Sequence, residues 1–251
     1  MATLDISLYK YIRGANARSI LWTLIDVNGH DVLRASANLR RIIRDILNKM
    51  RRKHAKEKFH GDLGDPKNIV FEKGNIEALK FINSKPEANK DDDYKGLGQL
   101  LEEICQVTTL RGNGKSYYTL DDETINFKRD LSGRIMVSCK LYIHHHYWLM
   151  DAGERQKFFS NAFNRIKTDD KLKNELDGIQ SALSPFPSAI PKHTIFSQIL
   201  ARGHRSKYQD NMNHLITFVR HSYEHWQETV QFKEHVLQME CRCTSLFRLN
   251  L

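Results

Sequence analysis

The chain has 251 residues, of which 40% are hydrophobic and 27% are charged, and its formal net charge is +9. This composition is ordinary for a globular protein that is long enough for one or two domains with apolar cores. No apolar run reaches the roughly 18 residues that a membrane-spanning helix needs. The N-terminal residues lack the pattern of a secretory signal, so we expect a protein of the cytosol or nucleus.

The excess of positive charge favours an anionic partner, either a nucleic acid or a membrane surface. Much of this charge lies in the run 49–58, Lys-Met-Arg-Arg-Lys-His-Ala-Lys-Glu-Lys. We interpret this run as the solvated end of an amphipathic helix, because charge runs usually form solvated faces.

The cysteines are too few and too scattered for a disulfide framework. Cys241 and Cys243 form a Cys-x-Cys pair with His235 nearby, but a zinc site needs further ligands at suitable spacing. We therefore expect ordinary thiols, no metal and no cofactor.

The first half of the chain contains two apolar stripes at helical spacing. The stripe in residues 39–50 consists of Ile42, Ile43, Ile46, Leu47 and Met50. The stripe in residues 94–105 consists of Leu97, Leu100, Leu101 and Ile104. Between them, residues 68–82 alternate short apolar runs about the turn Glu-Lys-Gly-Asn, which is typical of a β-hairpin. The residues that precede His60 are interpreted as helical.

The second half is predicted to be helical with loops. Residues 107–130 indicate only a loop with short strands, and helical character returns near Ile135. A helix begins after Asp151, which with Glu154 forms a capping-box pattern. The proline-rich residues 184–193 predict a loop, and residues 211–226 carry an apolar helical face. The predicted fold class is therefore mainly α.

The stretch 59–71, Phe-His-Gly-Asp-Leu-Gly-Asp-Pro-Lys-Asn-Ile-Val-Phe, resembles a protein-kinase catalytic loop. Asp62 matches the aspartate that orients the substrate hydroxyl, and Asn68 matches the magnesium-binding asparagine, one residue later than usual. Asn83, Ser84 and Lys85 stand where Asp-Phe-Gly is expected. Asparagine brings no negative charge to a metal, and no glycine-rich phosphate loop lies upstream. The resemblance implies a truncated, degenerate kinase C-lobe-like domain over residues 1–140 that is not an active kinase.

A second similarity involves two stretches of the chain. The first is residues 142–166, which begin Tyr-Ile-His-His-His-Tyr-Trp-Leu-Met-Asp-Ala-Gly-Glu-Arg and end at Ile166. The second is the block 214–228, His-Leu-Ile-Thr-Phe-Val-Arg-His-Ser-Tyr-Glu-His-Trp-Gln-Glu. Together they resemble the kinase-extension nuclease (KEN) domain of the inositol-requiring stress sensors of the endoplasmic reticulum and of ribonuclease L. Residues 21–30 also resemble plant members of the stress-sensor group. The resemblance implies an all-helical KEN ribonuclease-like domain over residues 141–251.

This resemblance implies metal-independent RNA cleavage, in which the 2′-hydroxyl attacks the adjacent phosphate and leaves a 2′,3′-cyclic phosphate. Arg220 matches the phosphate-binding arginine of the family and His225 its general-acid histidine, five residues apart. His221 stands where the family has asparagine, and Tyr208 matches the catalytic tyrosine after an alignment gap of one residue. RNA phosphates are expected to contact two further basic residues, Lys207 and Arg205.

Alternatives stay open for these residues. Arg220 and His225 are also compatible with ordinary exposed helix positions, and His221 with His225, four residues apart, is compatible with a metal pair that lacks a third ligand. For His144 to His146 a packing or capping role is preferred to metal binding.

Three functions follow from these patterns. The first is an endoribonuclease that acts on RNA, with a role in mRNA processing or the unfolded-protein response. The second is a nuclease-dead module that dimerises with a full-length relative and regulates it. The third is a basic RNA-binding protein without cleavage, which fits the charge alone. The resemblance implies either a homodimer or a heterodimer with a related kinase and ribonuclease.

Overall fold

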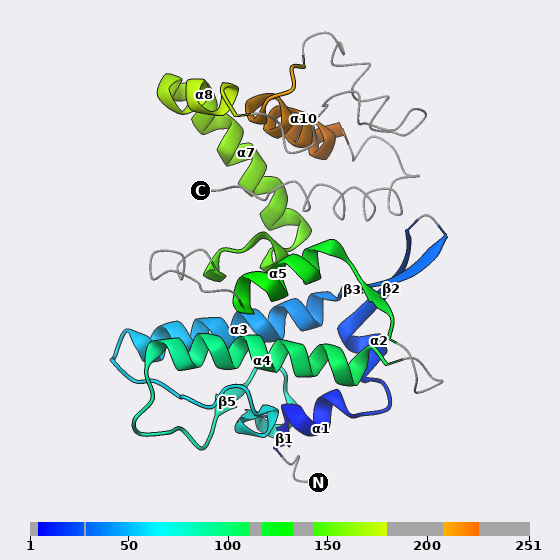
Figure 1. The fold of residues 1–251 in the computed structure, drawn as a ribbon, viewed down its shortest axis with the longest axis vertical. Coiled ribbons are helices and arrows are strands. Elements are labelled where there is room, and N and C mark those ends of the chain that lie inside the picture. The colour runs from blue at the N-terminus through cyan, green and yellow to red at the C-terminus, as the bar shows by residue number, and fades with distance from the viewer. Residues whose placement is uncertain (1–4, 28, 111–116, 133–142, 180–207, 226–251) are drawn as a thin grey trace. The chain divides into compact units, whose positions relative to one another are not determined.

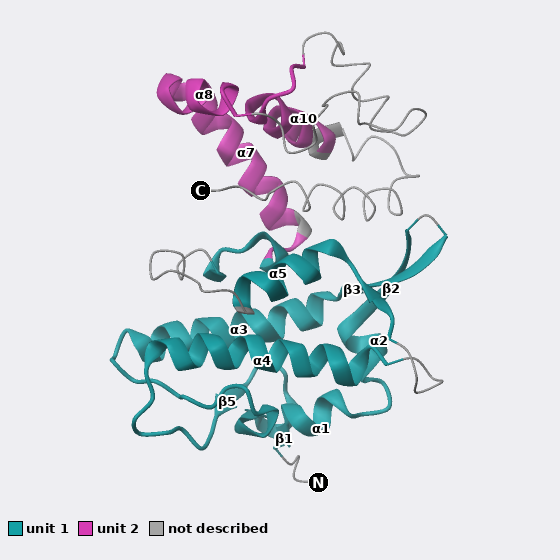
Figure 2. Cartoon of the chain, viewed as in Figure 1, with its two compact units in different colours: residues 1–149 teal, residues 150–251 magenta. Residues whose placement is uncertain are grey.

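The computed structural model describes residues 5–27, 29–110, 117–132, 143–179 and 208–225. Helices account for 60% of this part, and the strands form two small three-stranded sheets, so the protein is helix-rich but mixed α/β (Figure 1). The chain divides into two compact units, residues 1–149 and 150–251 (Figure 2). The boundary expected after residue 140 falls in a segment outside the described residues.

The core of the first unit surrounds α3 (Ala37–His54) and α4 (Lys90–Thr108). Ser36 caps α3 by accepting a hydrogen bond from the Leu39 N–H, and Asn89 with Asp92 forms a capping box on α4. Both predicted apolar stripes are confirmed, because all of their members are buried. Two shorter helices, α1 (Leu8–Ile12) and α2 (Ala17–Leu21), precede α3.

The predicted hairpin is confirmed and belongs to the first sheet. Its strands β4 (Ile69–Phe71) and β5 (Leu79–Phe81) pair antiparallel, with Val70 opposite Lys80, and β1 (Ile6–Ser7) pairs with the other edge of β4. Two 3-10 turns flank β4, namely η1 (Pro66–Asn68) and η2 (Glu72–Gly74).

The helical interpretation of the residues before His60 is wrong for one long segment. Strands β2 (Trp22–Val27) and β3 (His30–Ala35) form an antiparallel hairpin, and β6 (Thr119–Leu120) adds to β3 in parallel. The sequence signal for this hairpin is the dipeptide Asn28-Gly29 between two apolar runs. Gly29 has a φ of +79°, a conformation that glycine adopts without the steric cost of a side chain.

The loop predicted over residues 107–130 is also partly wrong, because α5 (Asp122–Ser132) occupies its second half. Only two apolar side chains of this helix, Phe127 and Leu131, are in the buried core, so its apolar stripe is too short to be recognised. Its other buried side chains are polar. Phe127 stacks on Trp148 of η4 (Tyr147–Leu149) with ring centroids 4.3 Å apart, and the Trp148 indole donates a hydrogen bond to Thr124.

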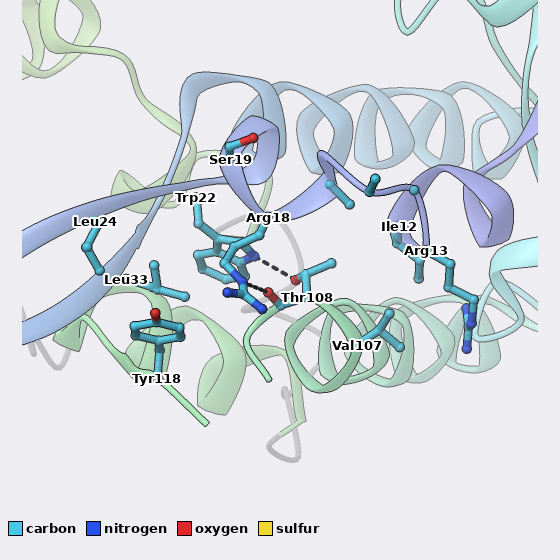
Figure 3. Close-up of a pocket in the computed structure, with 13 residues that line it drawn as sticks. Ile12, Arg13, Arg18, Ser19, Trp22, Leu24, Leu33, Val107, Thr108 and Tyr118 are labelled. Carbon is cyan, nitrogen blue, oxygen red and sulfur yellow. Dashed lines mark hydrogen bonds between the residues drawn. The ribbon is translucent and has the colours of Figure 1, made fainter. Parts of the chain in front are cut away.

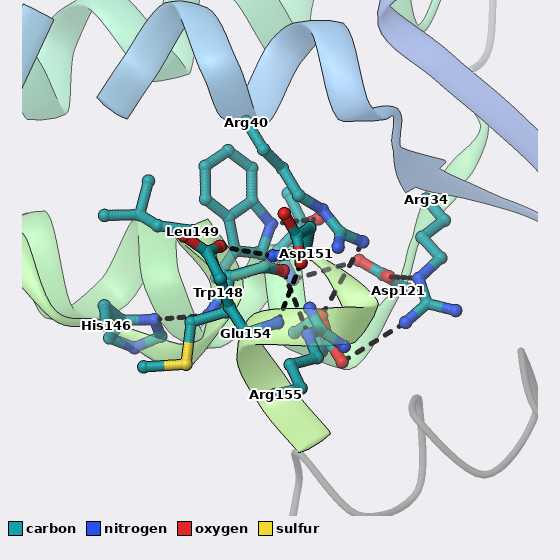
Figure 4. Close-up of polar contacts among 12 residues, drawn as sticks. Arg34, Arg40, Asp121, His146, Trp148, Leu149, Asp151, Glu154 and Arg155 are labelled. Carbon is teal, nitrogen blue, oxygen red and sulfur yellow. Dashed lines mark hydrogen bonds and ion pairs between the residues drawn. The ribbon is translucent and has the colours of Figure 1, made fainter. Parts of the chain in front are cut away.

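The described part of the second unit consists of helices α7 (Ala152–Thr168), α8 (Asp170–Asp177) and α10 (Met212–His225). The capping box of Asp151 and Glu154 is confirmed, with both hydrogen bonds 2.8 Å long (Figure 4). The helix expected from residue 151 to 176 is divided at Asp169, whose carboxylate caps α8 by accepting the Leu172 N–H. The proline-rich loop 184–193 and the segment around Ile135 lie outside the described residues.

A search of the described residues finds no helix with the length and apolar character that crossing a bilayer requires.

Candidate functional site

Helix α10 carries three of the predicted nuclease residues, and its start is fixed by polar contacts. Asn211 caps the helix, since its side-chain oxygen accepts the His214 N–H at 2.9 Å. Asn213 donates to the Asp177 carboxylate at 2.9 Å, and the Met212 N–H donates to the Ile179 carbonyl at 3.0 Å. These contacts hold the first turn of α10 against the end of α8. The apolar face then packs inward through Met212, Leu215, Ile216, Phe218 and Val219.

Tyr208 and His221 meet in this unit. The Tyr208 hydroxyl lies 2.8 Å from Nδ1 of His221, although the two residues are thirteen positions apart. Tyr208 is only 8% exposed, and burial raises the pKa of its phenol. The Tyr208 ring packs edge-on against Phe218, with ring centroids 5.7 Å apart. The hydroxyl is therefore held in one place and stays protonated at neutral pH.

Arg220 and His221 share a neighbour on α7. The Arg220 guanidinium lies 4.5 Å from the centroid of the Phe163 ring, within the range of a cation–π contact, and the His221 ring centroid lies 6.3 Å from it. Both side chains are half-buried. Phe163 was not among the predicted site residues, because nothing in its local sequence indicates contact with a helix that begins almost fifty residues later.

The structure describes the remaining predicted nuclease residues only in part. His225 is the last residue of α10, one turn after His221 on the same side of the helix, but its side chain lies outside the described part. Lys207 and Arg205 lie outside the described residues, as do His235, Cys241 and Cys243. Within the described residues no three His, Cys, Asp or Glu side chains gather as metal ligands.

The kinase-like residues Asp62 and Asn68 form a second cluster, in the first unit. The Asn68 side chain donates to the Asp62 carbonyl at 3.0 Å and accepts from the Asn83 side chain at 3.0 Å. The Asp62 carboxylate pairs with the Lys85 ammonium at 3.3 Å. The structure thus brings together the positions that the resemblance aligned with a kinase catalytic loop. Their side chains supply one carboxylate, one ammonium and two amides.

The connection between β5 and α4 covers this cluster. It runs only from Ile82 to Asn89, and the Lys85 N–H donates to the His60 carbonyl at 2.8 Å. Gly61 has a φ of +77°, and a Cβ on it would lie 2.4 Å from the Ala88 Cβ. The connection therefore lies directly on the loop, which leaves no room for a side chain at position 61.

Asp93 of α4 anchors the same loop from inside. Its carboxylate accepts the Gly61 N–H at 2.7 Å, the His60 N–H at 3.1 Å and the His54 ring nitrogen at 2.7 Å. Burial opposes the ionisation of Asp93, but the hydrogen bonds from His54 and from the two main-chain groups outweigh it and lower the pKa of this carboxyl. The loop is thus held by a buried negative charge.

Two histidines of the 144–146 run form internal hydrogen bonds. His144 Nε2 lies 2.9 Å from the Tyr94 hydroxyl, and burial lowers the pKa of His144 to about 4. His146 Nδ1 accepts the Trp148 N–H at 3.0 Å, while its Nε2 lies 3.3 Å from Asp130. These contacts are of the packing and capping kind.

A buried ion cluster joins β3 to the start of α5. The Arg34 guanidinium lies 3.6 Å from Asp121 and 3.4 Å from Glu123, and all three side chains are nearly inaccessible (Figure 4). Burial, with the nearby Glu123 charge, raises the pKa of Asp121 to about 6. Asp121 also accepts the Thr124 N–H at 2.9 Å, so the cluster fixes the first turn of α5.

A scan of the sequence against models of protein families finds no match, and a search of curated proteins finds none either. The similarity to nucleases and kinases is therefore a resemblance of residue pattern.

Proposed function

We propose that the second unit is an RNA-cleaving module that works without a metal ion. The observation that supports this proposal best is the contact of 2.8 Å between Tyr208 and His221, because it orients an imidazole beside Arg220. The combination of a histidine with a fixed ring and an adjacent arginine suits proton transfer next to a phosphate.

In this proposal His221 is the general base. Its Nδ1–H donates to the neutral Tyr208 oxygen, which leaves the lone pair on Nε2 to take the proton of the RNA 2′-hydroxyl. The raised pKa of Tyr208 disfavours the phenol itself as the base, so its role is to position the ring. This interpretation gives a function to the residue at which the chain departs from the family pattern.

His225 is the general acid and Arg220 stabilises the phosphorane. The 2′-oxygen bonds to phosphorus, the bond from phosphorus to the 5′-oxygen breaks, and His225 donates a proton to that oxygen as it leaves. Residues four apart on a helix have Cβ atoms roughly 5–6 Å apart, which suits a base and an acid that act on one phosphate. The guanidinium of Arg220 carries a permanent charge that complements the extra negative charge of the transition state.

The proposal is tested with a labelled stem-loop RNA in EDTA over a series of protein concentrations. The wild-type protein is expected to cleave, and His225→Ala is expected to lower the rate by about 10²- to 10⁴-fold, because general acid catalysis contributes that much. His145→Ala, at an exposed histidine of the first unit, is the matched control and is expected to cleave like the wild type. Equal cleavage by His225→Ala and the wild type, or no cleavage at any concentration, would overturn the proposal.

A second candidate function is a nuclease-dead module that binds and tunes a full-length relative. The pairing of Lys85 with Asp62 and the short connection from Ile82 to Asn89 favour it, because among the described residues around Asp62 the carboxylate is already neutralised by an ammonium and is not available to a metal ion. This function predicts no cleavage by the chain alone and a changed cleavage rate when it is mixed with an active family member.

A further inference from the structure

A cavity of about 670 Å³ lies in the first unit, away from the residues discussed above (Figure 3). It is bounded by the connection between α1 and α2, by the β2–β3 hairpin and by the C-terminal end of α4. Its volume falls within the roughly 300–1,000 Å³ of small-molecule sites in proteins. The apolar and aromatic side chains that line it are Ile12, Trp22, Leu24, Leu33, Val107 and Tyr118.

Two arginines line this cavity, and Arg18 is the one that lies beside its aromatic residues. Its Nε donates to the Thr108 carbonyl at 3.1 Å and its Nη2 donates to the Leu110 carbonyl. Within the part of the chain that the structure describes, Nη1 makes no hydrogen bond and no carboxylate forms an ion pair with this guanidinium. The carbonyls at the end of α4 orient the group, but they do not neutralise its charge. A half-buried guanidinium with unused donors complements an anion.

The surroundings of Arg18 are rigid and apolar. The Trp22 indole donates to Thr108 Oγ1 at 2.7 Å, which fixes the ring beside the guanidinium, and the Tyr118 ring centroid lies 5.3 Å from the Arg18 guanidinium carbon. Leu24 is 53% exposed, which is high for a leucine that faces other apolar groups. A flat apolar body would therefore bury surface here while its charged end meets Arg18.

Arg13, also at the edge of the cavity, is already engaged. Its Nη2 donates to the Glu103 carboxylate at 2.9 Å, and its guanidinium carbon lies 3.8 Å from the Tyr9 ring centroid. In Figure 3 its side chain points away from Arg18. Among the described residues that line the cavity, Arg18 is thus the one cation without a carboxylate partner, which indicates a ligand with a single charged group.

We propose that this cavity binds a small organic anion, a flat apolar molecule that carries one carboxylate or sulfonate group. The anionic oxygen accepts a hydrogen bond from Arg18 Nη1, and the apolar body lies against Leu24 and Leu33. This site is independent of the proposed RNA-cleaving site, which belongs to the other unit, so either proposal can fail without the other.

The probe for this proposal is 1-anilinonaphthalene-8-sulfonate, a fluorescent aromatic sulfonate, with the uncharged N-phenyl-1-naphthylamine as its counterpart. We expect the sulfonate to bind the wild-type protein at a single site with a Kd in the tens of micromolar, which is typical of a ligand of this size. The uncharged probe is expected to bind at least about tenfold more weakly, because one charge-assisted hydrogen bond is lost. Equal affinities for the two probes would overturn the proposal.

Ala15 offers a matched pair of variants, because it lines the cavity and its own side chain is exposed. Ala15→Glu is expected to weaken sulfonate binding about five- to tenfold through charge repulsion, whereas Ala15→Gln, of the same size, leaves it nearly unchanged. Thr23→Glu, at an exposed residue of the same hairpin that does not line the cavity, controls for added charge. Arg18→Met is expected to weaken sulfonate binding at least about tenfold and to leave the affinity for the uncharged probe nearly unchanged.

Circular dichroism and the urea midpoint of each variant establish that it is folded before binding is compared. An equal loss of affinity in Ala15→Glu and Ala15→Gln would overturn the proposal, because the size of the new side chain and not its charge would then determine the affinity for the sulfonate. Displacement of the sulfonate by stem-loop RNA would also overturn it, because the cavity would then be part of an RNA-binding surface.

Discussion

In the proposed mechanism, the contact between Tyr208 and His221 determines which proton transfers the second unit can perform. In the proposed mechanism His221 must be neutral and His225 must be protonated at the start of each turnover. A base that must be neutral and an acid that must be protonated give a bell-shaped dependence of the cleavage rate on pH. His221, at which the chain departs from the family pattern, is thus assigned a catalytic role.

The first prediction at this scale concerns the pH profile. The wild-type rate of RNA cleavage is expected to have its maximum between about pH 6 and 7. His221→Asn, which restores the residue of the family pattern, is expected to remove the limb on the acidic side of the maximum, because that limb reports the base. Tyr208→Phe is expected to lower the rate by about 10- to 100-fold and to keep both limbs, since it only frees the ring. An unchanged acidic limb in His221→Asn would contradict the assignment of the base.

Asp93 supplies a prediction about stability. Its side chain is 1% exposed and accepts hydrogen bonds from two main-chain N–H groups and from His54. Asp93→Asn is expected to lower the free energy of unfolding at pH 7 by about 2–4 kcal/mol, because a charged acceptor is lost while its donors stay buried. Urea denaturation measures the change, with Glu87→Gln at an exposed position as the control.

The pH dependence of this difference follows from the lowered pKa of Asp93. A carboxyl whose folded-state pKa lies below its ordinary value of 3.8 contributes stability above that pH, and the contribution is lost as the pH falls through the folded-state pKa. The difference in the free energy of unfolding between the wild type and Asp93→Asn is therefore expected to be largest near pH 7 and to decrease below about pH 4. A gap that widens on acidification would contradict this account.

At the scale of elements, the connection between β5 and α4 defines the first unit's polar cluster. It places Lys85 against Asp62 and Ala88 against Gly61. The carboxylate, the ammonium and the two amides of the cluster satisfy one another, so the cluster carries no excess negative charge for a metal ion. This arrangement depends on the short connection, which brings the side chains of Asn83 and Lys85 back to the loop.

Gly61 and Gly29 form a matched pair for testing this packing. Both have a positive φ, +77° and +79°, but a Cβ on Gly61 would meet Ala88 at 2.4 Å whereas a Cβ on Gly29 would meet nothing within 4 Å. Gly29→Ala is expected to lower the free energy of unfolding by about 1 kcal/mol from backbone strain alone. Gly61→Ala is expected to cost about 2–4 kcal/mol, because overpacking adds to the strain.

Adding Ala88→Gly to Gly61→Ala is expected to recover part of the lost free energy of unfolding. Chemical denaturation of the wild type, the two single variants and the double variant measures this recovery as a double-mutant cycle. Equal losses of unfolding free energy in Gly61→Ala and Gly29→Ala would show that the connection between β5 and α4 does not pack against the loop at Gly61.

The elements also show how far the sequence predicts this fold. The helices α3 and α4 and the hairpin β4–β5 were predictable, because most of their buried side chains are apolar and recur at regular spacing. The hairpin β2–β3 carried the Asn-Gly turn signal, which the helical interpretation overlooked. Helix α5 was not predictable from its apolar residues, because its first turn is buried through Asp121, Glu123 and Thr124, and only tertiary partners make that burial favourable.

For the candidate nuclease site the sequence proposes residues but not how they are arranged. The pattern indicated Tyr208, Arg220 and His221, and the structure describes all three side chains. The contact of Tyr208 with His221 depends on the Asn211 cap, which sets where α10 starts, and Phe163 is brought to the site by a different helix. Such contacts follow from packing, which a single sequence does not encode locally.

At the scale of the whole molecule, two compact units carry different chemistry. The first unit holds a self-neutralised polar cluster and a cavity with one unneutralised arginine. The second unit holds the histidine, tyrosine and arginine that we assign to RNA cleavage. The net charge of +9 suits a polyanionic substrate, and electrostatic attraction to RNA phosphates weakens with added salt.

The measurement that tests the central claim most directly uses two stem-loop RNAs that differ by one atom. The site of cleavage is first mapped on an all-ribose RNA in EDTA, and a second RNA then carries a 2′-deoxyribose at that nucleotide. The account predicts that the first RNA yields a fragment whose mass includes a 2′,3′-cyclic phosphate, and that the second RNA is not cut at that position. Cleavage of the deoxy-substituted RNA at the same bond, or an ordinary 5′-phosphate on the products, would contradict attack by the 2′-hydroxyl and with it the proposed function.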